Sequence, residues 1–167
     1  NRFFYPDHSA TSQLLTDLAF YLAESGTSVT VLASRQIYDD PDRVLSSKDT
    51  QRAVCIVRPW STRFGREKMW GRICDYMTFY LSAAWALLVL AKAKDVLIVK
   101  TDPPLISVVA GVVAKCRGAL VCNWTQDLFP EVAQALEFGG NDWIQTVLRK
   151  LRNWSLRTAK CNVAIGE

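Results

Sequence analysis

The segment Asp95–Glu131 constrains the fold of this chain more than any other part of the sequence. It holds an apolar run, Val96–Val99, that stops at the turn signal TDPP at 101–104, and an apolar helical stretch follows. A second apolar run then leads to Gln126 and Asp127. This order predicts one βαβ unit with a polar cluster at the end of each strand. Ligands of open parallel sheets bind just beyond the carboxyl ends of strands, so the segment indicates both the fold class and the place to look for function.

Strands and helices alternate along the rest of the chain as well. Apolar periodicity and turn residues predict further strands at 1–4 (the tail of one), 29–33, 53–57 and 161–165, and helices at 10–25, 69–93, 131–138 and 142–159. The polar stretch 34–51 is expected to be a surface loop. Such alternation predicts an α/β fold, a Rossmann-like doubly wound and mostly parallel sheet with helices on both faces. The length of 167 residues suits one domain.

Composition limits the class of protein and the kind of site. Half of the residues are hydrophobic and 22% are charged, which excludes wholesale disorder, and the net charge of +4 is compatible with anionic partners. With one histidine, and five cysteines that form no CxxC pair, no metal site is expected. The cysteines are interpreted as buried, reduced thiols of a cytoplasmic protein. No signal peptide is visible, and we expect the chain to be a fragment of a longer protein, cut at both ends.

The loop that leaves the first predicted strand is one candidate site. It runs from Tyr5 to Ser12, and small or hydroxyl residues at a helix start leave backbone N–H groups that can hold a phosphate. Ser9 and Thr11 would contribute to such a site, but either is also a good helix cap whatever the function. His8 is a candidate acid or base, with a solvated loop histidine as the alternative.

Polar residues at the ends of two later strands form the second candidate site. Asp127 follows an apolar strand together with Gln126, at the sheet edge where ligands bind, and a carboxylate there can orient or deprotonate a hydroxyl. We favour this catalytic role over a helix cap, whereas Glu131 is assigned to the first turn of the next helix. Asp102 follows the other strand, where capping ahead of Pro103 is favoured over substrate contact.

A basic and aromatic segment, 58–72, is the third candidate. Its cations are interleaved with large rings: Arg58, Trp60, Arg63, Phe64, Arg66, Lys68, Trp70 and Arg72. This mixture suits a membrane interface, where cations meet anionic lipids and rings lie at headgroup depth. It equally suits RNA, through phosphate contacts and base stacking. The other alternative is a solvated loop whose rings fold back onto the core.

The helix that follows this segment is strongly apolar. Between Asp75 and Lys92 it carries no charge over roughly 16 residues, against the ~20 that span a bilayer. Because the helix also keeps its place in the strand–helix alternation, a buried or membrane-grazing helix is favoured over a transmembrane span.

Taken in order, these elements resemble the N-terminal domain of the family-4 glycosyltransferases, enzymes of the GT-B fold. The matching elements cover nearly the whole chain: FFYPDHS at 3–9, TDLA and LAESGTSVTV within 16–31, TDPP at 101–104 and QDLFPE at 126–131. QDLFPE is fairly specific, and the others are weak alone. The sequence looks most similar to bacterial sugar transferases that build polysaccharides on lipid-linked acceptors.

The resemblance implies that residues 1–167 are the N-terminal, acceptor-binding domain of a two-domain enzyme, inactive without the donor-binding C-terminal domain. It implies retaining transfer of a sugar from a nucleotide-sugar to an acceptor hydroxyl, without a metal or other cofactor. Asp127 then positions or deprotonates that hydroxyl, with the leaving phosphate as the other proton acceptor. The residues expected at the substrates are His8, Ser9, Thr11, Asp102 and Gln126.

The expected partners are the nucleotide-sugar, a sugar or lipid-linked acceptor, and an anionic membrane surface, but no nucleic acid. The residues expected to meet the membrane or the acceptor are Trp60, Arg63, Phe64, Arg66, Lys68 and Trp70. The protein is expected to be cytoplasmic and peripheral on the inner face of the cell membrane. The alternative is a non-catalytic binding or regulatory domain, since a fold does not fix a function. A nucleotide-binding oxidoreductase is disfavoured because no GxGxxG follows the first strand.

Overall fold

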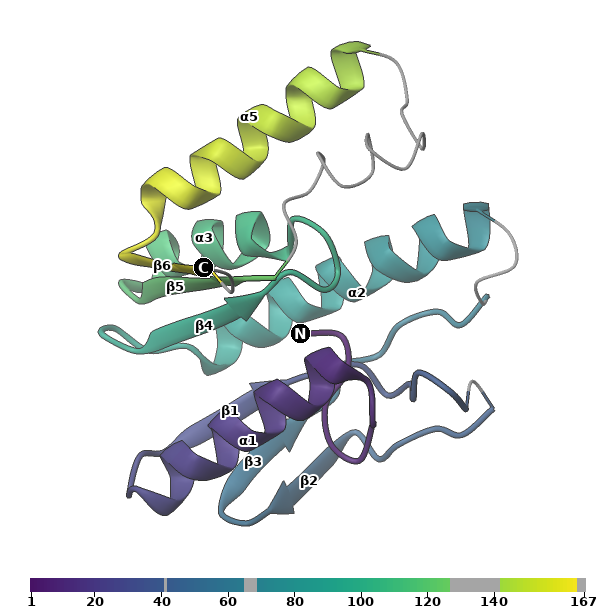
Figure 1. Ribbon diagram of the computed structural model, residues 1–167, viewed down its shortest axis with the longest axis vertical. Helices are drawn as coiled ribbons and strands as arrows, with labels where there is room; N and C mark the ends of the chain where they lie inside the picture. The colour runs from purple at the N-terminus through teal and green to yellow at the C-terminus, as the bar shows by residue number, and fades with distance from the viewer. Residues whose placement is uncertain (41, 65–68, 127–141, 165–167) are drawn as a thin grey trace. The chain divides into compact units, whose positions relative to one another are not determined.

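The structure is a computed structural model that describes residues 1–40, 42–64, 69–126 and 142–164. The chain divides into two compact units, unit 1 (Asn1–Ala86) and unit 2 (Leu87–Glu167). Each unit contains helices and a three-stranded sheet with parallel strands (Figure 1). The expected α/β class is therefore confirmed, with the described strands divided between two sheets.

Unit 1 packs a helix on a mixed sheet. Its elements are α1 (Ala10–Glu24), β1 (Val29–Leu32), β2 (Lys48–Gln51), β3 (Val54–Val57) and most of α2 (Met69–Leu90). The central strand β3 runs parallel to β1 and antiparallel to β2. Buried apolar side chains of the first loop, α1, β1 and β3 form the core: Phe4, Leu15, Ala19, Phe20, Val31, Ala33, Val54 and Ile56.

Two expectations for unit 1 are wrong in detail. The end of the segment 34–51 is not loop but the strand β2. Its sequence, KDTQ, has no apolar residue, so hydrophobic periodicity could not predict it. The segment 1–4 is not a strand, although Phe3 and Phe4 are buried and the carbonyl of Arg2 accepts a 2.8 Å hydrogen bond from the N–H of Ser34.

Unit 2 has a parallel sheet with two helices on one side of it (Figure 1). The elements are β4 (Val96–Lys100), α3 (Ile106–Arg117), β5 (Leu120–Thr125), α5 (Asp142–Thr158) and β6 (Cys161–Ala164), with sheet order β4-β5-β6. The succession β4–α3–β5 is the βαβ unit that the sequence predicts. Gly118 ends α3 in the left-handed conformation, with φ of +70°, which costs glycine little because it has no Cβ.

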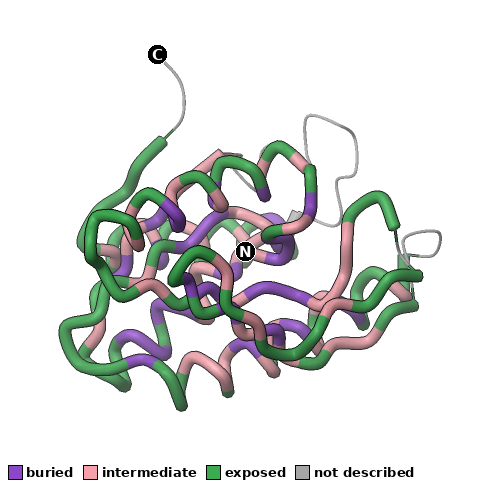
Figure 2. The backbone as a smooth tube through the Cα atoms, turned by 90° about the horizontal axis from the view of Figure 1, so that it is seen from below, coloured by how far each residue is buried: buried purple, intermediate pink, exposed green. Residues whose placement is uncertain are grey.

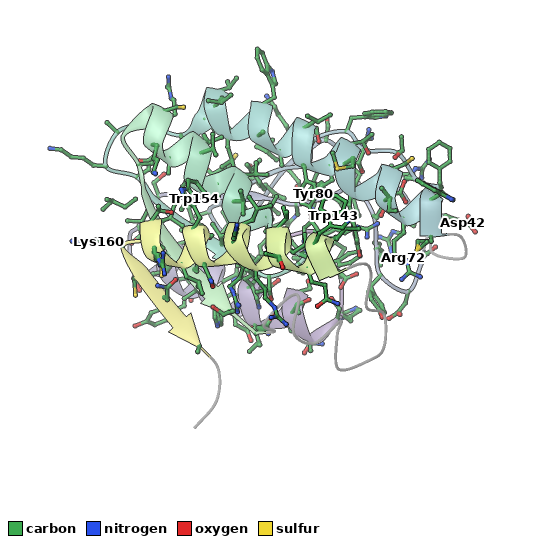
Figure 3. The ribbon with its side chains drawn as sticks, turned by 90° about the horizontal axis from the view of Figure 1, so that it is seen from above. Asp42, Arg72, Tyr80, Trp143, Trp154 and Lys160 are labelled. Atoms are coloured by element: carbon green, nitrogen blue, oxygen red, sulfur yellow. The ribbon has the colours of Figure 1, made fainter. Side chains whose placement is uncertain are left out.

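Close packing fixes α5 beside α3 and over β5. A Cβ on Gly111 of α3 would lie 3.1 and 3.2 Å from two ring atoms of Trp154, which Figure 3 labels on α5. The side-chain amide of Asn123 on β5 donates to Asn162 Oδ1 at 2.9 Å and lies 3.4 Å from Ser155 Oγ of α5. Because of these contacts α5 forms a wall over the carboxyl end of β5.

The sequence predicts buried cysteines, and this prediction is wrong. All five are free, four are exposed, and Cys122 is half-buried. Cys55 lies between the buried Val54 and Ile56, and neighbouring strand residues point to opposite faces of a sheet. Buried and exposed residues therefore follow one another closely along the tube in Figure 2. An apolar run predicts a strand, but it does not say which face a cysteine takes.

Candidate functional site

The carboxyl ends of β4 and β5 lie side by side at one edge of the unit 2 sheet, where Lys100 pairs in register with Trp124. A pocket opens there with about 40 Å³ of space for water. Binding sites for whole small molecules have volumes of roughly 300–1,000 Å³, so this pocket fits a few waters or one functional group. Its walls come from both strand ends, the start of α3 and α5: Val99, Lys100, Thr101, Leu105, Ser107, Asn123, Trp124, Thr125, Arg152, Ser155 and Leu156.

Lys100 is the least expected residue of this pocket, because lysine is rarely fully buried. Its side chain is 1% exposed, and Nζ lies 4.3 Å from the ring centroid of Trp124, a cation–π contact. Burial lowers the pKa of Lys100 to about 8, and the carboxylate of Asp102 partly opposes that shift. The pocket thus holds a cation whose proton is bound less firmly than that of an ordinary lysine.

Asp102 and Gln126, two of the residues expected at the substrates, follow the two strands at this same edge. Asp102 lies two residues after the end of β4 and does not take the expected capping place, since the N-cap position of α3 is Leu105. Gln126 comes directly after β5. Its Oε1 is buried and has no hydrogen-bond partner among the described residues. Such an orphaned acceptor is unusual in folded proteins and suits a ligand donor.

Asp127, the expected catalytic carboxylate, and Glu131 lie outside the described residues. Lys100 and Asp102 interact electrostatically at this edge, and Gln126 follows the neighbouring strand β5, immediately before Asp127 in the chain. Asp102 and Gln126 do not line the pocket itself. Lys100 was missed by sequence reasoning. The available signal is a lysine that ends the apolar run VLIVK of a parallel strand covered by helices.

The loop before α1, the other expected substrate site, is organised by Asp7. The carboxylate of this buried residue accepts hydrogen bonds from the backbone N–H and hydroxyl of Ser9 and from the N–H of Tyr38. Ser9 does hold the N-cap position of α1, but its hydroxyl makes no capping bond to the helix. The N–H of Ser9 therefore donates to Asp7, and the expected contact of Ser9 with a substrate phosphate stays a prediction.

His8 and Thr11 flank this organised turn. The side chain of His8 is exposed, and its carbonyl accepts a 2.8 Å hydrogen bond from Gln13 Nε2. Thr11 is half-buried in the first turn of α1. Both residues remain at the amino end of a helix, where the helix dipole favours anions. Their role as ligand contacts stays a prediction.

The aromatic rings of the basic and aromatic segment do not fold back onto the core. Trp60, Phe64 and Trp70 are large exposed hydrophobic residues, and Arg63 is exposed as well. Arg66 and Lys68 lie outside the described residues.

Arg58 differs from the rest of the segment, since its side chain is buried. It donates to the carbonyl of Tyr5 at 2.8 Å and lies 3.9 Å from a carboxylate oxygen of Asp49. Burial lowers the pKa of Arg58, and Asp49 opposes that shift. Arg58 is therefore a structural residue and not part of an exposed basic surface.

α2 is not the buried helix that was one of the two favoured interpretations. It is long and apolar enough to cross a membrane, yet only 17% of its most apolar window is buried. Among the described residues, no group of three or more histidine, cysteine or acidic side chains is placed to hold a metal ion.

The two units thus present separate candidate features: the polar edge of β4 and β5 in unit 2, and the loop before α1 and the exposed α2 in unit 1. Comparison with known proteins adds nothing to them, since no protein-family model, no curated protein and no solved structure matches the chain.

Proposed function

We propose that this chain is the acceptor-binding domain of a retaining glycosyltransferase that moves a sugar from a nucleotide-sugar to an acceptor hydroxyl. The observation that carries the proposal is the β4–β5 edge, where a buried lysine, a carboxylate and an orphaned amide oxygen gather immediately before Asp127. The Rossmann-like, doubly wound form of the fold belongs to the same proposal and is supported by the parallel β4–α3–β5 unit.

The chemistry needs a group that orients the acceptor hydroxyl while the bond from the sugar to the diphosphate breaks and the bond to the acceptor forms. Asp127 accepts the hydroxyl proton or a hydrogen bond from it, and the leaving diphosphate is the other acceptor for that proton. Gln126 Oε1 accepts a hydrogen bond from a second hydroxyl of the acceptor. Lys100 offsets the negative charge at this edge. Its pKa is about 8, so its amine is protonated in most molecules at neutral pH.

The size of the pocket supports a division of labour between two domains. Space of about 40 Å³ suits one hydroxyl or a few waters and is too small for a nucleotide-sugar. In the proposal the nucleotide-sugar is held mainly by a second domain of the full-length protein. The acceptor is a lipid-linked sugar or polysaccharide, and the enzyme works in the cytoplasm at the inner face of the membrane.

The decisive test is Asp127→Asn in the full-length protein, with Glu131→Gln as the matched control. Release of nucleoside diphosphate is measured over a panel of nucleotide-sugars, with thermal melting to confirm that both variants fold. Loss of the positioning carboxylate is expected to lower turnover by a factor of 100 or more. Glu131→Gln, which removes a carboxylate assigned to a helix turn, is expected to stay within threefold of wild type.

Near-normal turnover of Asp127→Asn would contradict the assignment of this residue. If the full-length protein binds a nucleotide-sugar but releases no diphosphate under any condition, the non-catalytic binding domain becomes the better account.

A further inference from the structure

Two cysteines stand opposite each other on neighbouring strands of unit 2. Cys122 on β5 and Cys161 on β6 are partners in the parallel register, and the two strands lie side by side in Figure 1. Neighbouring strands are about 4.8 Å apart, and residues bridged by a disulfide have Cα atoms roughly 4.4–6.8 Å apart. The backbone therefore places the two residues within reach of a covalent bond.

Both cysteine side chains point to the same face of the sheet. The residues that follow them, Asn123 and Asn162, bond to each other through their side chains, and Asn123 also lies 3.4 Å from Ser155 Oγ of α5. Successive strand residues point to opposite faces, so Cys122 and Cys161 share the face that is turned away from α5. The two sulfur atoms are therefore neighbours, as the backbones are.

The two thiols already interact in the reduced protein. Burial raises the pKa of the Cys122 thiol, and a hydrogen bond with the Cys161 thiol raises it further. Cys161 is exposed, whereas Cys122 is half-buried. An oxidant in solution therefore reaches Cys161 first, with the protonated thiol of Cys122 beside it.

Cys55 offers a contrast, because it too is exposed on a strand. Its register partners are Thr30 on β1 and Thr50 on β2, so no second thiol stands opposite it in the described sheet. On β4 the register partner of Cys122 is Ile98, which carries no thiol. Cys122 and Cys161 are thus the one pair of cysteines in register among the described strands.

We propose that Cys122 and Cys161 form a redox-modification site, at which a low-molecular-weight disulfide oxidises the two thiols to a cross-strand disulfide. The Cys161 thiolate attacks one sulfur of the small disulfide and breaks its S–S bond. A mixed disulfide forms, and one small thiolate leaves and takes up a proton. Cys122 then loses its proton to water, and its thiolate attacks the Cys161 sulfur and expels the second small thiol. In total, two protein thiols are oxidised and one small disulfide is reduced to two thiols.

The resulting bond is expected to be reversible. Side chains paired on one face of a sheet are about 4.8 Å apart, as the strands are, whereas a disulfide draws the Cβ atoms to about 3.8 Å. A bond that requires such an adjustment is reduced more easily than an unstrained structural disulfide. The closed chain loop contains α5 and Asp127, the proposed catalytic residue. Oxidation itself requires no sugar transfer, so this inference and the proposed function can fail independently.

The test incubates the full-length protein with mixtures of glutathione and glutathione disulfide. Remaining thiols are blocked with N-ethylmaleimide, and disulfide-linked peptides are identified by mass spectrometry. A peptide pair joined through Cys122 and Cys161 is expected, and dithiothreitol is expected to restore both thiols. Because the fold holds the two thiols together, half-oxidation of the pair is expected at about tenfold less glutathione disulfide than a mixed disulfide at Cys55 requires.

Single substitutions separate the two chemical steps. Cys122→Ser removes the thiol that closes the cross-strand bond, so the mixed disulfide at Cys161 is expected to accumulate to about ten times its wild-type level. Cys55→Ser is the matched control and is expected to leave the cross-link unchanged. Phenylarsine oxide, which bonds two neighbouring thiols at once, is expected to bind wild type and Cys55→Ser about tenfold more tightly than Cys122→Ser or Cys161→Ser.

Three outcomes would overturn the proposal. One is a mixed disulfide at Cys161 that accumulates in the wild type as much as in Cys122→Ser, since Cys122 then does not reach that sulfur. Another is a disulfide that joins Cys161 to a second protein molecule. The third is a Cys161 that stays reduced in the native protein where Cys55 is modified. The wild-type measurement requires no substitution, so a variant that fails to fold does not prevent the test.

Discussion

The loop before α1 in unit 1 and the β4–β5 edge in unit 2 were both predicted as substrate sites, yet their buried polar groups differ in how well hydrogen bonds and charges compensate for burial. In the loop, the buried carboxylate of Asp7 accepts hydrogen bonds from Ser9 and Tyr38. At the edge, Lys100 is buried at the expense of its proton affinity, and Gln126 Oε1 has no partner among the described residues.

The two regions differ in how their polar groups affect stability. Asp7 stabilises the fold, whereas Lys100 and Gln126 lower its stability. Buried polar groups with hydrogen-bond partners stabilise a protein, whereas unpaired or shifted ones destabilise it. Perturbed groups gather at functional sites because ligand binding or catalysis requires them there. The comparison therefore favours a stabilising role for the loop and supports the proposal of a functional site at the β4–β5 edge.

Asp7→Ala is expected to have the largest effect on stability. It removes the acceptor of three half-buried hydrogen bonds, so the free energy of unfolding is expected to fall by about 3 kcal/mol in urea titrations. Asp17→Ala is the matched control, because Asp17 is an aspartate in the middle of α1 that is exposed, and its change is expected to stay within about 0.5 kcal/mol. Equal stability of the two variants would contradict the stabilising role of Asp7 in the loop before α1.

Sequence patterns were sufficient for the elements that carry their own signals. The apolar runs around β4, α3 and β5, together with Gly118, predicted these elements to within a residue or so because each is bounded by turn residues. The strand β2 has no such signal, since KDTQ pairs through its backbone. How strands divide between sheets depends on contacts distant in sequence, which local periodicity does not report.

The residues that organise the candidate sites were harder to predict than the strands. Asp7 stands two residues before Ser9, the spacing of an Asx turn, so its role could have been found from the sequence. The burial of Lys100 has a weaker signal, its place at the end of the apolar run VLIVK, because a lysine at a strand end ordinarily extends its amine to solvent. Asp127, Arg66 and Lys68 lie outside the described residues, and their roles stay predictions.

Lys100→Met tests, through the pH dependence of stability, whether burial of the Lys100 charge destabilises the protein. The pKa of Lys100 is lowered from 10.5 to about 8 in the folded protein, so the unfolded chain binds more protons between these pH values. The destabilisation by Lys100 is therefore complete below pH 8 and disappears as the pH rises to 10.5. Methionine keeps the contact with the Trp124 ring without the charge. At pH 7 the variant is expected to be more stable than wild type by about 2 kcal/mol.

The measurement is urea unfolding of both proteins from pH 7 to pH 10.5, in which the difference in free energy is expected to close above pH 8. Lys115→Met is the control, because Lys115 also lies over a tryptophan ring, 4.7 Å from the centroid of Trp154, but is exposed. A difference for Lys100→Met that does not change with pH would assign the effect to packing and not to a buried charge.

Gln126→Leu is expected to have the smallest effect on stability. It is also expected to stabilise the protein while weakening acceptor binding, which separates the two roles of the residue. Gln126 Oε1 is a buried acceptor without a partner in the described part of the chain, so its removal relieves a desolvation cost and the free energy of unfolding is expected to rise by about 1 kcal/mol. The matched variant in unit 1 is Gln36→Leu. Gln36 Oε1 accepts a 2.6 Å hydrogen bond from Arg2, and its Nε2 donates to the carbonyl of Thr62 at 3.2 Å, so its loss is expected to destabilise by about 1 kcal/mol.

Under the proposed function, Gln126→Leu in the full-length protein is expected to raise the KM for the acceptor about tenfold, the effect of losing one hydrogen bond worth about 1.4 kcal/mol, with little change in the KM for the nucleotide-sugar. Gln36→Leu is expected to leave both constants near wild type at a temperature where the variant is folded. If Gln126→Leu both destabilises the protein and leaves acceptor KM unchanged, Gln126 belongs with Asp7 among the residues that build the fold. The contrast between the loop before α1 and the β4–β5 edge would then rest on Lys100 alone.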